Sequence, residues 1–139
     1  MEYRRFDSTY VLRLDPGEEI LDCVRVFAER EGVKLASVQA IGAVREFTVG
    51  AFDTVEKQYH SNEFRGTYEI TSLMGTINTM DGGFYAHLHM NAADETGRAV
   101  GGHLNRAVVS ATCEMIVTLI PGAVDRQFSE QVGLNLFKF

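Results

Sequence analysis

Hydrophobic and polar positions divide this chain into one short helical stretch and a long series of strands. From Leu35 onward, runs rich in β-branched and aromatic residues are separated by turn residues, which is typical of β-structure. Together with an earlier apolar run, they predict strands at residues 10–14, 36–44, 47–52, 66–78, 84–92, 98–104 and 111–120. Short turns between the strands favour a mainly antiparallel sheet.

One segment has the helical period instead. Its apolar positions fall three or four residues apart, at Ile20, Cys23, Val24, Phe27 and Ala28. The preceding Asp15-Pro16-Gly17-Glu18-Glu19 predicts a helix start, with an Asx-type cap, a proline near the first turn and acidic charge at the positive end of the dipole. Gly32 predicts the helix end. We therefore expect an α+β fold in which one principal helix packs on antiparallel sheet.

Three histidines are the strongest chemical signal. His87 and His89 lie two positions apart on a predicted strand, so both face one side while Leu88 faces the other. A three-residue loop at Glu95-Thr96-Gly97 would place His103 opposite His89 on the returning strand, where Cβ atoms lie roughly 5 Å apart. The pair Gly101-Gly102 removes side chains next to that point, which lets backbone or a ligand approach closely.

A second turn, Asp81-Gly82, fixes the other neighbour of this strand. A two-residue hairpin there predicts Thr76 opposite His87 and Met74 opposite His89. The histidine strand would then be internal, with a partner on each side.

The ligand set His87, His89 and His103 contains no thiolate, which suits Zn²⁺ or another borderline divalent cation. Three protein ligands leave a coordination position open for water or substrate. The alternative interpretation is that these are half-buried strand residues that hydrogen-bond to backbone. His60, in a polar run, has no partner in sequence and is expected at the surface.

Length and composition describe an ordinary globular chain. With 139 residues, 45% hydrophobic and 23% charged, we expect a single domain over residues 1–139 with its core at about 10–137. No segment approaches the roughly 18 apolar residues of a membrane span, and no apolar signal core follows the N-terminus. We expect a cytoplasmic protein with no membrane partner.

The charge of the chain bears on nucleic-acid binding, and the spacing of its cysteines bears on disulfide formation. The formal net charge is −6, and basic residues are scattered singly except for Arg4-Arg5, so the surface is expected to repel a phosphate backbone. Cys23 and Cys113 lie far apart within apolar segments, which predicts buried free thiols.

Several segments together resemble one family, the plants-and-prokaryotes conserved (PPC) domain. They are Leu12-Arg13-Leu14-Asp15-Pro16-Gly17-Glu18-Glu19, Gly42, Gly66-Thr67-Tyr68-Glu69-Ile70-Thr71-Ser72-Leu73-Met74-Gly75, His87-Leu88-His89, Val100-Gly101-Gly102-His103 and Gly133-Leu134-Asn135-Leu136. Where the family often has Gly-Arg-Phe-Glu-Ile, this chain has Gly66-Thr67-Tyr68-Glu69-Ile70, and its basic residue is displaced to Arg65.

The resemblance implies a PPC-like α+β fold assembled as a homotrimer, with sites near subunit boundaries. Members from plants bind DNA through a separate AT-hook that enters the minor groove. This sequence contains no such motif, so direct nucleic-acid binding is not expected. Prokaryotic members tend to keep the three histidines, which fits a metal role. The fold is also similar, distantly, to that of acetolactate decarboxylase, a zinc enzyme with three histidine ligands.

Three functions are compatible with these sequence features. The first is a trimeric metal-binding module that binds a small ligand or a protein partner. The second is a metal-dependent lyase or hydrolase acting on a small carbonyl or carboxylate compound, with Glu69 or Glu114 as proton-transfer candidates and Arg65 or Arg106 as substrate-binding candidates. The third is a regulatory protein accessory to DNA binding.

Overall fold

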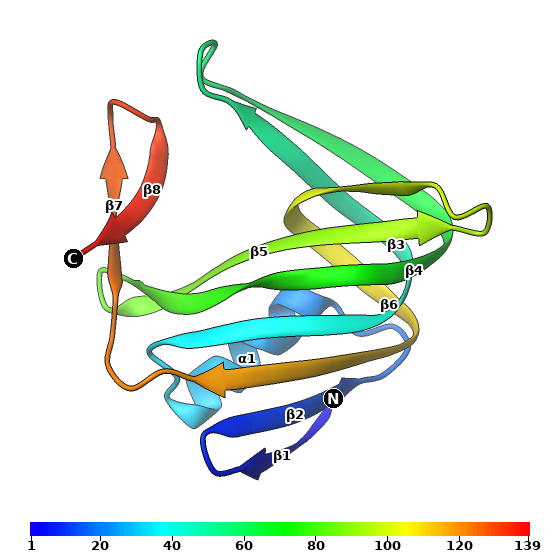
Figure 1. Ribbon diagram of the computed structural model, residues 1–139, viewed down its shortest axis with the longest axis horizontal. Coiled ribbons are helices and arrows are strands. Elements are labelled where there is room, and N and C mark those ends of the chain that lie inside the picture. The colour runs from blue at the N-terminus through cyan, green and yellow to red at the C-terminus, as the bar shows by residue number, and fades with distance from the viewer.

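The computed structural model describes residues 1–139, and its ribbon is drawn in Figure 1. In chain order the elements are β1 (Glu2–Phe6), β2 (Thr9–Leu14), α1 (Ile20–Glu31), β3 (Ala36–Asp53), β4 (Gln58–Met80), β5 (Gly83–Asp94), β6 (Ala99–Leu119), β7 (Asp125–Ser129) and β8 (Leu134–Lys138). The fold is mostly antiparallel β-sheet with one helix, as the hydrophobic pattern predicted. That helix is neither long nor apolar enough to cross a bilayer.

The main sheet has the strand order β1-β2-β6-β3-β4-β5, and β5 also pairs with the first part of β6. This additional pairing curls the sheet back on itself, because β6 contacts both β3 and β5. The strands β7 and β8 form a separate two-stranded sheet. In Figure 1 this C-terminal hairpin, coloured orange and red, stands beside one end of the main sheet.

The strands are longer than their sequence patterns predicted. Segments 36–44 and 47–52 belong to one strand, β3, and segments 98–104 and 111–120 belong to one strand, β6. Register shifts at Ala40/Gly42 and Val44/Glu46 interrupt the alternation of β3 without ending the strand. Such β-bulges change which face a side chain occupies, and this breaks the two-residue period. The short strands β1, β7 and β8 were not predicted.

The helix begins later than the sequence suggested. The side chain of Glu19, not of Asp15, caps it by accepting a hydrogen bond from the backbone N–H of Asp22 at 2.7 Å. Residues 15–18 form a turn instead, in which Glu18 N–H donates to the carbonyl of Asp15 at 3.2 Å, and Gly17 N–H ties this turn to β6 by donating to the carbonyl of Val109 at 2.9 Å. Gly32 ends the helix in the left-handed region at φ 63°, as predicted.

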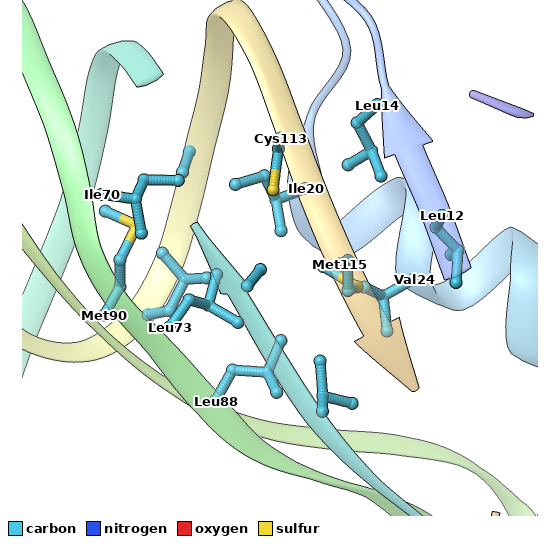
Figure 2. Close-up of a cluster of buried hydrophobic side chains, with 14 of the residues drawn as sticks. Leu12, Leu14, Ile20, Val24, Ile70, Leu73, Leu88, Met90, Cys113 and Met115 are labelled. Carbon is cyan, nitrogen blue, oxygen red and sulfur yellow. The ribbon is translucent and has the colours of Figure 1, made fainter. Parts of the chain in front are cut away.

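One hydrophobic core joins α1 to the strands. Figure 2 shows Ile20 and Val24 of the helix among side chains from β2, β4, β5 and β6. Cys113 lies in this core and Cys23 is half-buried, and both are free thiols. Burial raises the pKa of Cys23 to about 11 and that of Cys113 to about 12, so neither is a reactive thiolate at neutral pH.

Candidate metal centre

The three histidines come from two adjacent strands of the main sheet. His87 and His89 lie on β5, and His103 lies on β6 directly opposite His89. On the other side of β5, Thr76 faces His87 and Met74 faces His89. Both predicted registers are confirmed. Leu88, which is 1% exposed, points into the core and holds the strand in this orientation.

The ring nitrogens lie close enough to share one ion. Each histidine offers a nitrogen, and the three chosen nitrogens all lie within 4.8 Å of one another. The Nε2 atoms of His87 and His89 are 3.3 Å apart. Tetrahedral zinc with Zn–N bonds of about 2.0–2.1 Å separates its ligand nitrogens by about 3.3 Å. The pair on β5 therefore already has the spacing of one tetrahedral edge.

Glycines bring the surrounding backbone into close contact. A Cβ atom on Gly102 would lie 2.5 Å from the carbonyl oxygen of Gly50 on the neighbouring strand β3. On β4, a Cβ on Gly75 would lie 2.9 Å from Cα of Leu88. The expected close approach beside the histidines is thus made by backbone, and it packs the histidine strands tightly between their neighbours.

The histidines line a pocket of about 840 Å³. Its opposite wall is the C-terminal hairpin, which contributes Phe128 from β7 and Leu134 and Leu136 from β8. Polar side chains also line it, and at one side the hydroxyl of Tyr59 donates to Oδ1 of Asn105 at 2.5 Å. No Asp or Glu lines it.

Burial and nearby positive charge keep His87 and His103 neutral. The pKa of His87 falls to about 4, chiefly because burial disfavours the imidazolium, and then because of the positive charge of Arg126 and the other two histidines. The pKa of His103 is also lowered, first by burial and then by His89 and Arg126. Neutral imidazole is the form that ligates a metal, so His87 and His103 need to lose no proton at pH 7.

Arg126 lies behind His87. Its Nη2 is 3.4 Å from Nδ1 of His87, while Nε2 of His87 faces His89. A guanidinium can only donate, so a hydrogen bond here requires the proton of neutral His87 to lie on Nε2. Ligation of a cation through Nε2 requires the other tautomer. Metal binding by His87 would therefore release Nη2 of Arg126 from this contact.

The other sequence-derived candidates lie elsewhere. Arg106 forms an ion pair with Glu46 at 2.7 Å, and Arg65 lines the same shallow surface hollow. Glu114 is exposed and lines a different hollow. Glu69 is exposed and pairs with Ala43 and Ala93, several residues along the strand from the histidines. The structure brings none of these four to the histidine pocket.

His60 is exposed on β4, as expected. Three pocket residues were not identified from the sequence: Arg126, Tyr85 and Asn105. The one sequence signal near them was the apolar segment Gly133-Leu134-Asn135-Leu136, which is part of the family resemblance. In the structure this segment forms β8 and covers the pocket that contains the histidines.

The fold and the histidine cluster agree with a comparison against protein families. Residues 1–121 match the Plants and Prokaryotes Conserved (PCC) domain, the family abbreviated PPC above. This chain belongs to that family. The match ends before β7, so the C-terminal hairpin lies outside the matched residues.

Two solved structures are similar over nearly the whole chain. A candidate DNA-binding protein from Bacteroides thetaiotaomicron is 28% identical with a TM-score of 0.96, over 99% of this chain and 96% of that one. The metal-containing protein AF0104 from Archaeoglobus fulgidus is 33% identical with a TM-score of 0.88, over 99% and 97% of the two chains.

Two further comparisons cover only part of the other protein. α-Acetolactate decarboxylase from Bacillus subtilis shares the fold, with a TM-score of 0.60 at 13% identity over 88% of this chain and 57% of that one. The bifunctional protein GlmU from Synechococcus sp. (strain JA-3-3Ab) is 31% identical over 123 residues, or 88% of this chain. The chain spans only 18% of the length of that curated relative.

Proposed function

We propose that this chain is a divalent-metal-binding module that holds one ion, with zinc the best fit, between His87, His89 and His103 and presents it to a small ligand in the adjoining pocket. The observation that carries the proposal is the mutual approach of the three ring nitrogens to within 4.8 Å. A relative that is 33% identical is named a metal-containing protein, which supports the same reading.

The donor set fits the ion. Neutral imidazoles without thiolate or carboxylate suit a borderline cation such as Zn²⁺. Three protein ligands leave a position open for a ligand, and all three histidines line the pocket. When bound, such an ion supplies a Lewis acid that can hold an oxygen of a ligand.

The test is the metal content of untagged protein purified without chelator, measured beside two variants. The double variant His87→Ala/His89→Ala removes ligands, and His60→Ala removes a histidine outside the cluster. We expect about one zinc per chain in the wild type and in His60→Ala, and almost none in the double variant. Equal metal content in all three proteins would refute the site.

We also propose that residues 1–139 form a single domain and that three copies assemble. Apolar side chains exposed at a surface hollow on the main sheet support an interface there: Phe6 is 54%, Val11 42% and Ile41 59% exposed. Such side chains favour association with another surface. Sedimentation equilibrium should give three times the chain mass, and Ile41→Asp should lower it.

An enzymatic role is the first alternative. A metal beside an enclosed pocket is the arrangement that metal-dependent lyases and hydrolases use. The pocket of this chain holds the phenol of Tyr59 but no carboxylate. Turnover of small keto acids or esters by the zinc-loaded protein, lost in the double histidine variant, would favour this alternative.

A DNA-linked role is the second alternative. It is supported by the name of the Bacteroides thetaiotaomicron relative, which is a candidate DNA-binding protein. A formal net charge of −6 works against contact with a phosphate backbone. Retention on duplex DNA that weakens steeply with salt would favour the DNA-linked role.

A further inference from the structure

Arg126 is the one charged side chain that the fold buries. It is only 5% exposed, and no carboxylate forms an ion pair with it. By contrast, Arg13, Arg25 and Arg106 each pair with an acidic side chain at the surface. A buried charge is costly unless it is compensated, so a guanidinium without a counter-charge suggests that its anion comes from outside the chain.

The surroundings hold the guanidinium in a fixed orientation at the pocket wall. Its Nε donates to Oδ1 of Asn78 at 3.1 Å, and its Nη1 donates to the carbonyl of Asn135 at 2.7 Å. The rings of Phe137 and Tyr85 lie 4.2 and 4.9 Å from its Cζ atom. These contacts come from β4, β5 and β8. The packing of three strands therefore fixes the position of the Arg126 side chain.

We propose that Arg126 binds the carboxylate of a small organic anion, whose apolar part lies against the C-terminal hairpin and whose other end faces the histidine cluster. A guanidinium presents five N–H donors in a planar fork that matches a carboxylate. Its protein contacts use only some of these donors, and the others are free for a ligand. This inference rests on the proposed function for its metal-facing end, and on Arg126 alone for its anion-binding end.

The contact between Arg126 and His87 connects the anion-binding group to the metal-binding group. Nη2 of Arg126 is 3.4 Å from Nδ1 of His87 and has no other acceptor in the chain. Once Nε2 of His87 ligates a cation, Nδ1 carries the proton and no longer accepts from Nη2. Metal binding therefore frees a donor of Arg126, and the metal and the anion should bind with positive coupling.

The pocket wall favours an organic anion over inorganic phosphate. Phe128, Leu134 and Leu136 are 59%, 38% and 39% exposed and line the same pocket as Arg126. A ligand with an apolar part would cover these side chains and remove them from water, which an inorganic ion does not do.

The experiment measures the binding of benzoylformate by isothermal titration calorimetry. This probe carries a carboxylate, a keto oxygen and an aromatic ring, and its neutral amide, benzoylformamide, is the matched control ligand. Inorganic phosphate is the third ligand. Each is titrated into zinc-free and zinc-loaded samples of the wild type, Arg126→Gln, Arg126→Lys and Arg98→Gln. Arg98 is exposed in the loop between β5 and β6 and lies outside the pocket, so it controls for overall charge.

We expect benzoylformate to bind the wild type and Arg98→Gln alike, and the amide to bind at least roughly tenfold more weakly. Arg126→Gln should weaken benzoylformate roughly ten- to a hundredfold, and Arg126→Lys should weaken it less, because lysine keeps the charge but loses the fork. Zinc should strengthen binding in the wild type and have a smaller effect in Arg126→Gln. Zinc content and thermal unfolding confirm that each variant is folded.

Unchanged benzoylformate binding in a folded, zinc-loaded Arg126→Gln would overturn the inference, because the carboxylate would then be held by the metal alone. Phosphate binding as tight as benzoylformate would overturn the assignment to an organic carboxylate. Binding that depends on Arg126 in a protein that takes up no zinc would support the anion site and refute the proposed metal function, so the two failures are distinguishable.

Discussion

The two hairpins that form the pocket differ in how the fold supports them. The histidine hairpin, β5–β6, is internal: β5 pairs with β4 and β6 pairs with β3, and residues between its histidines reach the core. The C-terminal hairpin, β7–β8, is a separate two-stranded sheet and contributes none of the 26 residues of the core cluster. It contacts the main sheet through polar groups such as Arg126, whose Nε donates to Oδ1 of Asn78 on β4 at 3.1 Å, and Asn135, whose Nδ2 donates to the hydroxyl of Tyr85 at 3.4 Å.

The two hairpins are therefore suited to different roles in the site. Metal ligands need positions accurate to a fraction of an ångström, and an internal hairpin supplies them. Side chains outside the core can be substituted with little loss of folding stability. This suits the part of a pocket that selects a ligand. The residues that match the family model include the three histidines and exclude Arg126, in line with this division.

The largest expected effect comes from forcing β4 and β5 apart beneath the histidines. In Gly75→Ala the new Cβ would meet backbone atoms of His87 and Leu88, which cannot move without breaking the strand pairing. We expect a loss of roughly 3 kcal/mol in the free energy of unfolding, measured with urea, together with weaker zinc binding. Gly83→Ala, at the start of the partner strand β5, meets only the carbonyl of Met80 at 3.4 Å and should change stability little. Equal effects of the two substitutions would contradict the tight packing described here.

Removal of the C-terminal hairpin tests the division directly. Deletion of residues 123–139 takes away β7, β8 and Arg126 but none of the core cluster. We expect the unfolding free energy to fall by less than about 2 kcal/mol and zinc binding to survive, while benzoylformate binding is lost. Circular dichroism and metal analysis measure the first two results. A truncated chain that unfolds or loses zinc would show that the hairpins are not independent.

Acid should destabilise the metal-free protein through His87. The pKa of His87 is about 4 in the folded state against 6.5 in a reference state. The unfolded state therefore takes up a proton as pH falls from about 6.5 towards 4 and the folded state does not, so stability is lost over that window. Because the His87 ring is partly exposed, we expect this loss of unfolding free energy to be about 1 kcal/mol.

The matched variant for this prediction is His87→Gln. It should flatten the decline in urea-unfolding free energy between pH 6.5 and 4 relative to the wild type, whereas His60→Gln should leave it unchanged. Parallel curves for the wild type and His87→Gln would show that the burial of His87 does not shift its titration.

The sequence predicted the histidine hairpin well because every step was local. Two short turns fixed the registers of His89 with His103 and of Thr76 with His87, and alternation placed both β5 histidines on one face. It predicted the helix end at Gly32 but not the cap at Glu19, because the pairing of residues 17–19 with β6 is a long-range contact.

The position of Arg126 could not be predicted from local sequence patterns. It is far from the histidines in sequence, and nothing local indicates that β7 folds back beside β4 to place it against His87. For the four charged candidates, Glu69, Glu114, Arg65 and Arg106, no predicted strand register led to the histidines, and the structure places them in other hollows or on the open surface.

The most direct test of the central claim is anomalous diffraction at the zinc edge, on crystals of the wild-type protein grown with zinc. We expect one strong peak per chain, about 2.0–2.1 Å from a nitrogen of each of His87, His89 and His103, with its open side towards the pocket. A crystal without a peak at these three residues, or with zinc bound only at exposed sites such as His60, would contradict it.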